Sequence, residues 1–228
     1  MSARNTLKTL VSALVINIAW VAPAAATTVV AQWNMDNTFG TTMVDTSGNG
    51  NNGTTYDVVT SGSGYMFNGT TSRVIVPDSP TLNPGTSDFT YSVQLQTDRI
   101  PPLGTDYDLI RKGTSISSGG EYKLEIIYSK GNGIALCAVK DAAGNIASIR
   151  GTTNVADGLL HTLTCIKTST SLTVLVDALP PRSVSATLTG SLNSWRPFAI
   201  GVKQGLLNGP ADDYFNGTMR SVSLSIEP

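Results

Sequence analysis

Short runs rich in β-branched, aromatic and other apolar residues fill most of the chain, and no long stretch has the spacing of an amphipathic helix. The run at 89–96 reads FTYSVQLQ and that at 171–176 reads SLTVLV, with apolar residues at every second position. This period of two is typical of a strand with one buried face. The pattern predicts strands over 29–33, 73–76, 89–96, 108–112, 122–128, 133–139, 145–149, 161–167, 171–176, 198–202 and 218–226.

Clusters of Gly, Pro, Asn, Asp and Ser separate these runs, and several form hairpin-like turns, such as GNG at 131–133. Regular short strands punctuated by turns predict an all-β fold, a two-sheet antiparallel β-sandwich. A sandwich of about 200–250 residues is commonly one unit. Nothing after residue 26 resembles a linker or repeat, so 27–228 is expected to form one domain.

The first 26 residues have the layout of a secretory signal peptide. Arg4 and Lys8 precede an apolar run at 10–20, and Ala24–Ala26 provide small residues for cleavage. The alternative is a membrane anchor, but the run is only half of the ~20 residues that a span needs. We therefore expect 1–26 to be removed and the protein to be extracellular, with no membrane insertion after cleavage.

Charge makes several partners unexpected. Without Arg4 and Lys8 the basic count is 15 − 2 = 13 against 16 acidic residues, a net charge of −3. The basic residues are scattered along the sequence, which disfavours nucleic acid and an anionic membrane surface as partners.

Cys137 and Cys165 are the cysteines of the chain, and each falls in the middle of an expected strand. An oxidising compartment would favour a disulfide between them, and two small buried thiols are the alternative. Closing a loop of that length would add about 3–4 kcal/mol.

The glycine-rich segment DTSGNGNNG, at 45–53, fits two ligand-binding patterns. It matches the dinucleotide fingerprint G-x-G-x-x-G and the first half of a calcium-binding EF-hand loop. The segment that follows is a poor helix, and Tyr56 stands where an EF-hand needs a bidentate acid. A tight loop that needs positive φ explains these glycines better.

Several segments, taken in chain order, resemble laminin G-like domains of the concanavalin A-like lectin and glucanase superfamily. They are WNMDNTFGTTMVDTSGNGNNGT, GYMFNGTTSRVIVP, SDFTYSVQLQ, LIRKG, DGLLHTLTCIK, SLTVLVDA, FAIG and FNGTMRSVSLS. The resemblance covers 29–226 and departs from the family at Leu160, where a Trp is usual, and at Ala178, where a Gly is usual. It implies a concanavalin A-like jelly roll, which hosts lectins, adhesion modules, hydrolases and lyases.

Glu121, Lys123 and Glu125 alternate along GEYKLEIIY, so they share one strand face. Retaining glycosidases of this superfamily place E-x-D-x-E on such a strand, but this chain has Lys123 in the central position. If the protein is an enzyme, Glu121 and Glu125, or a Tyr with His161, are the candidate catalytic residues. The alternatives are a solvated face with Glu–Lys–Glu charge pairing and a structural histidine.

Exposed aromatic residues and loop aspartates supply the remaining candidates. Sugar rings stack on aromatic faces, and Trp195, Tyr107 and Tyr214 are the candidate platforms, with loop packing as the alternative for each. Trp33 is expected in the core. Calcium prefers hard oxygen ligands, and the resemblance implies a structural calcium ion in some relatives. Asp36, Asp45 and Asp213 are the candidate ligands, with Asp212 beside the last of these, and ordinary turn-forming aspartates are the alternative.

The sequence therefore predicts a secreted, non-catalytic module that recognises extracellular polysaccharide or glycan. The alternatives are a polysaccharide-cleaving hydrolase or lyase, and a structural or adhesion module that binds protein.

Overall fold

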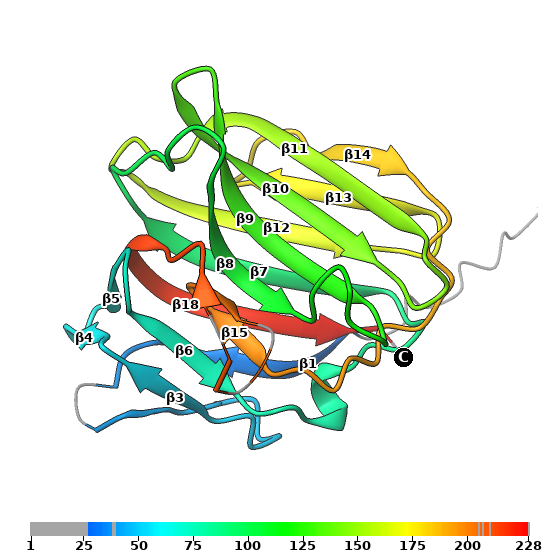
Figure 1. Cartoon of the computed structure of the whole chain (residues 1–228), viewed down its shortest axis with the longest axis horizontal. Coiled ribbons are helices and arrows are strands. Elements are labelled where there is room, and N and C mark those ends of the chain that lie inside the picture. Colours follow the sequence, from blue (N-terminus) through cyan, green and yellow to red (C-terminus); the bar gives the residue numbers. More distant parts are fainter. Residues whose placement is uncertain (1–26, 38–39, 205, 207, 210, 228) are drawn as a thin grey trace, which may run out of the picture.

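A computed structural model of the chain describes residues 27–37, 40–204, 206, 208–209 and 211–227 (Figure 1). The predicted signal peptide, 1–26, lies outside the described residues. The helix η1 (Pro80–Leu82) is a single 3-10 turn. Within the described part of the chain, no helix is long and apolar enough to cross a membrane.

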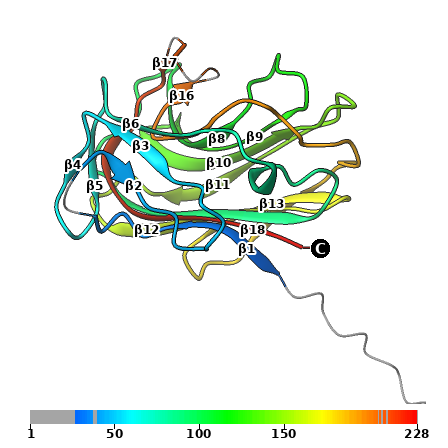
Figure 2. The ribbon, with the colours of Figure 1, turned by 90° about the horizontal axis from the view of Figure 1, so that it is seen from below.

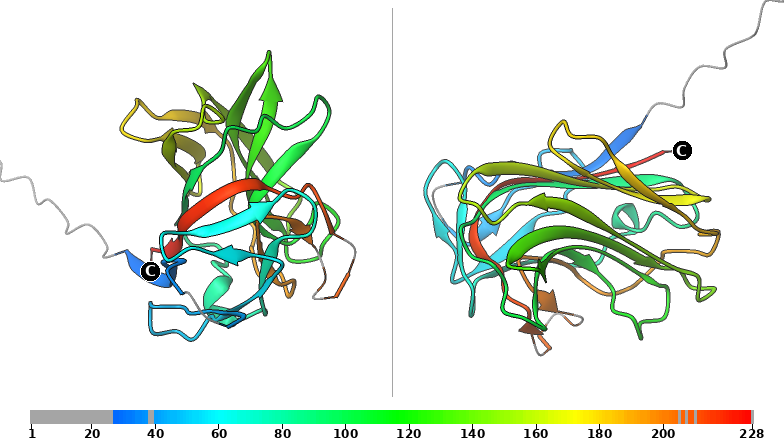
Figure 3. Two further views of the ribbon diagram at one scale, coloured as in Figure 1. Left: turned by 90° about the vertical axis from the view of Figure 1, so that its left-hand side faces the viewer. Right: turned by 90° about the horizontal axis from the view of Figure 1, so that it is seen from above.

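Two large antiparallel sheets pack face to face (Figures 2 and 3). Sheet A runs in the order β14 (Arg182–Ser185), β13 (Ser171–Val176), β12 (Leu160–Lys167), β7 (Phe89–Gln96), β18 (Asn216–Ile226), β5 (Tyr65–Asn68) and β4 (Val59–Thr60), and β1 (Thr28–Trp33) also pairs with β18. The predicted two-sheet antiparallel sandwich is confirmed.

Sheet B begins at the same margin of the molecule as β14 and ends at the N-terminal strands. Its order is β11 (Ile146–Asn154), β10 (Asn132–Lys140), β9 (Glu121–Ser129), β8 (Asp106–Lys112), β15 (Phe198–Ile200), β6 (Arg73–Val76), β3 (Gly53–Tyr56) and β2 (Thr42–Met43). A small hairpin of β16 (Lys203–Gln204) and β17 (Ala211–Asp212) lies on the side of sheet B that faces away from sheet A (Figure 2).

Apolar side chains fill the space between the sheets. The rings of Tyr91 on sheet A and Tyr122 on sheet B lie 5.4 Å apart, and Phe89 contacts both. Trp33 is fully buried, and its ring centre lies 5.2 Å from that of Phe198. Its predicted place in the core is therefore confirmed. Aromatic pairs at these distances add stability beyond the burial of their surface.

Cys137 on β10 and Cys165 on β12 form a disulfide, with their Cα atoms 5.8 Å apart. This inter-sheet disulfide joins β10, the second strand from one margin of sheet B, to β12, the third strand from the same margin of sheet A. The predicted pairing is confirmed, and both residues are fully buried in the core.

The glycine-rich segment is a closed loop held by Asp45. Oδ1 of Asp45 accepts the backbone N–H of Gln32, at 3.0 Å, and of Ser47, at 2.9 Å, and Oδ2 accepts that of Asn51 at 2.9 Å. Burial alone would raise the pKa of Asp45, but these hydrogen bonds lower it below its ordinary value. Gly48 and Gly50 have φ of 91° and 74°, so the glycines serve the loop geometry, as expected.

Candidate functional site

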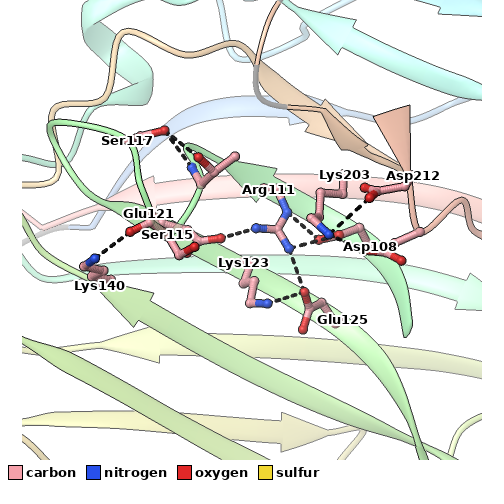
Figure 4. Close-up of polar contacts among 12 residues, drawn as sticks. Asp108, Arg111, Ser115, Ser117, Glu121, Lys123, Glu125, Lys140, Lys203 and Asp212 are labelled. Atoms are coloured by element: carbon pink, nitrogen blue, oxygen red, sulfur yellow. Dashed lines mark hydrogen bonds and ion pairs between the residues drawn. The ribbon is translucent and has the colours of Figure 1, made fainter. Parts of the chain in front are cut away.

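An ionic cluster centred on Arg111 lies on the outer face of sheet B (Figure 4). The Arg111 guanidinium donates to both carboxylate oxygens of Asp108, at 2.8 and 3.0 Å. It also donates to Glu121 and, at 2.7 Å, to Glu125 on the neighbouring strand. Arg111 is only 3% exposed and Asp108 is 0% exposed, so the centre of the cluster is removed from water.

A β-bulge in β8 creates this arrangement. Asp108 and Arg111 are three residues apart, so a regular strand would place them on opposite faces. The pairing of β8 with β9 shifts between Asp108 and Ile110, where two steps along β8 match one step along β9. The extra residue brings Asp108 and Arg111 to the same face, which is a common use of bulges near functional sites.

Carboxylates outnumber the cations that compensate them here. Burial raises the pKa of Asp108 well above its ordinary value, although the Arg111 charge opposes this effect. Burial also raises the pKa of Asp106 to about 6, with added repulsion from Glu125 and Asp213. Oδ1 of Asp106 is buried and accepts no hydrogen bond from any described residue. This end of β8 therefore holds an incompletely compensated negative charge.

The candidate catalytic glutamates are part of this cluster. Glu121, Lys123 and Glu125 share one face of β9. Lys123 donates to Glu125, so one of the two expected charge pairs is present, whereas Glu121 pairs with Arg111. The expectation that this face is solvated was wrong. Glu121 and Glu125 are 6% and 2% exposed, because Arg111 lies across both carboxylates from β8.

His161 lies on β12 between two aspartates. Its Nδ1 is 2.7 Å from Asp177 and its Nε2 is 3.0 Å from Asp157. Burial alone would lower the pKa of His161, but the hydrogen bonds and charges of the two aspartates outweigh it and raise the pKa. With both ring nitrogens engaged, His161 has the surroundings of a structural residue.

Two of the three candidate aromatics converge on one open depression of about 400 Å³ at the end of β8. We call it the tyrosine depression. Tyr107 enters it from β8, and Tyr214 enters it from the segment that follows the β16–β17 hairpin. Its lining is Gly69, Pro102, Thr105, Asp106, Tyr107, Ala211, Asp212, Asp213 and Tyr214.

Backbone and side-chain bonds hold the two walls of the tyrosine depression together. The backbone N–H of Asp108 donates to the carbonyl of Asp213 at 3.0 Å, which ties β8 to the hairpin segment. Lys203 donates to the Asp213 carboxylate at 2.8 Å and lies 3.4 Å from Asp212 (Figure 4). Tyr107 packs edge-on against buried Phe215, with ring centres 6.0 Å apart. The two tyrosines are thus positioned by the fold.

Trp195 lies apart from the tyrosine depression, in the loop before β15. Its side chain is exposed (57%), and the Arg196 guanidinium lies 4.1 Å from its ring centre. The buried Lys112 side chain donates to the Arg196 carbonyl at 2.7 Å and fixes this loop. Trp195 is therefore an exposed ring that already stacks with the Arg196 guanidinium.

The three aspartates predicted to bind calcium do not form one group. Asp36 is exposed and Asp45 is occupied in its own loop, whereas Asp213 lies beside Asp106 and Asp108. Carboxylate oxygens of Asp106, Asp108 and Asp213 all lie within 4.8 Å of one another. The orphaned Oδ1 of Asp106 and these hard oxygen donors fit a cation such as Ca²⁺, although Arg111 and Lys203 already neutralise the other two carboxylates.

Sequence reasoning missed Arg111, Asp106 and Asp108 as site residues. The segment 108–112, DLIRK, was interpreted as a strand, and neither Asp108 nor the preceding Asp106 was examined as a ligand. One signal was available: Asp106 and Asp108 are two residues apart, so in a strand their side chains share one face.

The sequence profile of the concanavalin A-like lectin/glucanases superfamily matches residues 68–225. No protein with a curated description matches the chain in sequence.

Many solved structures have a similar fold, among them the following three. A structure of botulinum neurotoxin type C, whose cell entry depends on two ganglioside molecules, aligns with a TM-score of 0.63 at 12% identity, covering 86% of this chain and 47% of that chain. Domain 4 of AbnA, an extracellular arabinanase from Geobacillus stearothermophilus, was solved in complex with arabinotriose. It aligns with a TM-score of 0.55 at 14% identity, covering 88% of this chain and 93% of that chain. Domains LG4-5 of the mouse laminin alpha1 chain align with a TM-score of 0.51 at 23% identity, covering 72% of this chain and 42% of that chain. The chain thus spans less than half the length of the neurotoxin and laminin chains.

Proposed function

Because this chain belongs to the concanavalin A-like lectin/glucanase superfamily, we propose that it is a secreted, non-catalytic module that binds extracellular carbohydrate in the tyrosine depression. The observation that carries the proposal is the convergence of Tyr107 and Tyr214 with carboxylates in one open depression. The inter-sheet disulfide supports an oxidising, extracellular location.

The chemistry of the tyrosine depression suits a sugar. Small-molecule sites combine an aromatic surface with a few convergent polar groups, and a volume of about 400 Å³ falls within their usual range. The two tyrosine rings offer flat apolar surfaces for the C–H faces of a pyranose or furanose. Asp106, Asp212, Asp213 and Thr105 offer acceptors for its hydroxyl groups, so the ligand expected here is neutral or rich in hydroxyls.

Two structural relatives support a glycan ligand. The arabinanase domain was solved with arabinotriose, and the neurotoxin uses ganglioside molecules for cell entry. Glu121 and Glu125 support a non-catalytic role, because both are buried and both accept hydrogen bonds from the Arg111 guanidinium.

Calcium has its best-supported place at Asp106, Asp108 and Asp213. Bound there, Ca²⁺ would compensate the negative charge at the end of β8 and offer a coordination point for sugar hydroxyls. These residues would hold the ion at the rim of the tyrosine depression, which two of them line.

The test is retention of the secreted chain on a panel of immobilised neutral polysaccharides, with and without a calcium chelator. Tyr214→Ala and Tyr107→Ala should each weaken retention about tenfold or more, because each removes an aromatic platform. Tyr128→Ala is the matched control, because Tyr128 is half-buried at the end of β9 and lies outside the depression.

Each outcome of this test has a defined meaning. Loss of retention with chelator would support the calcium site. Retention that survives both tyrosine variants would overturn the assignment to this depression. No retention on any glycan would refute carbohydrate binding and favour a protein-binding module, and release of reducing or unsaturated sugar would favour an enzyme.

A further inference from the structure

A second groove lies at the opposite margin of sheet B, between the two sheets. Its lining comes from β11, the edge strand of sheet B, from β13, and from the segment that leads into β14, the edge strand of sheet A. Figure 1 labels the two edge strands. Gly151 and Thr152 of β11 form one wall, and Leu179, Pro180 and Arg182 lie opposite. Its volume is about 400 Å³.

This groove continues into a neighbouring depression of about 320 Å³. The two share Gly151, Thr152 and Arg182, and the second one adds Lys130 and Arg150. We call the combined feature the edge groove. It is long and open, which suits an extended chain better than a compact small molecule.

Three cations line the edge groove without compensation. The side chains of Lys130, Arg150 and Arg182 are exposed, and none has a hydrogen-bonding or ionic partner among the described residues. Among the lysines and arginines in the described part of the chain, Arg220 on β18 is the other such side chain, whereas Arg99, for example, pairs with Asp98. No carboxylate belongs to the lining formed by the described residues.

The fold gathers cations that are scattered in the sequence. Lys130 lies in the β9–β10 turn, Arg150 in β11 and Arg182 in β14. Unpaired cations concentrated in a groove of an otherwise acidic protein form an attractive potential for an anionic ligand.

We propose that the edge groove binds an acidic polysaccharide, through its carboxylate or sulfate groups. Leu179, Pro180 and Pro181 are exposed beside the cations and offer apolar surface to sugar rings. None of the described lining residues is aromatic, so a nucleic acid would lack stacking platforms for its bases. The edge groove shares no lining residue with the tyrosine depression, so it is a second site with a different ligand charge.

The experiment measures binding of the chain to soluble polygalacturonate and to heparin, with dextran as the neutral probe, at low salt and at 0.15 M salt. The double variant Arg150→Gln/Arg182→Gln should bind both acidic polymers about tenfold more weakly. Each lost exposed ion pair should weaken binding about threefold, and the two losses multiply. Added salt should weaken binding of the unmodified chain, because exposed charges are screened within about 8 Å at that ionic strength.

A matched control separates a site from overall charge. Arg99→Gln/Arg220→Gln removes the same charge from exposed positions outside the edge groove, and it should bind almost as well as the unmodified chain. Equal losses in the two double variants would overturn the proposal, as would a loss of dextran binding in Arg150→Gln/Arg182→Gln as large as the loss of polygalacturonate binding. Tighter binding to duplex DNA or to anionic phospholipid vesicles would also overturn it and assign the groove to that partner. Binding of neutral glycans at the tyrosine depression is unaffected by any of these results.

Discussion

Replacing Arg111 with Met tests whether the ionic cluster on sheet B depends on a single cation. The side chain is buried, and its loss leaves Asp108, Glu121 and Glu125 in a site from which water is largely excluded. Breaking a buried ion pair by removing one partner costs about 3–5 kcal/mol, because the remaining charge is uncompensated. For a chain of this size the loss corresponds to a fall of about 6–20 °C in Tm.

The assay is urea unfolding followed by the fluorescence of buried Trp33, at pH 7 and at pH 5. Burial raises the pKa of Asp108 already with Arg111 present, and without the guanidinium the pKa should rise further. A carboxyl whose pKa is raised by folding stabilises the folded state at low pH, and this contribution to the free energy of unfolding is lost as pH rises. The loss of unfolding free energy caused by Arg111→Met should therefore be smaller at pH 5 than at pH 7.

The same change at an exposed, unpaired arginine provides the control. Arg220→Met should alter the free energy of unfolding by less than about 0.5 kcal/mol. A deficit below about 1 kcal/mol for Arg111→Met at pH 7, or one that is identical at both pH values, would refute the reasoning.

Three further predictions concern stability. Replacing both cysteines of the inter-sheet disulfide with Ala should lower the free energy of unfolding by about 3–4 kcal/mol, measured by denaturant titration; a loss below 1 kcal/mol would contradict the loop-closure argument. Asp177 and Asp157 bind the charged His161 ring and raise its pKa in the folded state. His161 should therefore stabilise the fold fully below about pH 6.5, and this contribution should be lost as pH rises through the folded-state pKa. His161→Gln should abolish this pH dependence in unfolding curves measured between pH 5 and 8. Folding raises the pKa of Asp106 from 3.8 to about 6, so ionisation of this carboxyl should destabilise the fold as pH increases through that interval. Asp106→Asn should therefore have a higher Tm than the unmodified chain at pH 7, and the same Tm at pH 4.

The longer strands were predictable from the sequence because their pattern is local. Strands β6, β7 and β13 have the predicted bounds, and every other predicted strand overlaps an observed one. The strands that were missed are short or polar. For example, β3 reads GTTY and β14 reads RSVS, and their pairing depends on neighbours far away in the chain.

The arrangement of the sites was less predictable, because it depends on contacts between distant segments. Tyr107, Tyr214 and Asp213 were each identified as candidates, but only the packing of the β16–β17 hairpin beside β8 brings them together. Glu121 and Glu125 were expected on a solvated face because the single-residue bulge that turns Arg111 toward them leaves no distinct mark in the sequence.

The position of β18 has a consequence for how the protein is made. This strand is near the end of the chain, yet it pairs with β7 on one side and with β1 and β5 on the other. Sheet B needs nothing beyond β15, whereas sheet A stays divided until β18 has left the ribosome. Until then β7 presents an unpaired edge, which is a template for wrong pairing. Closure of sheet A therefore waits for β18, and the edges of β1, β5 and β7 stay open to wrong pairing until that strand is in place.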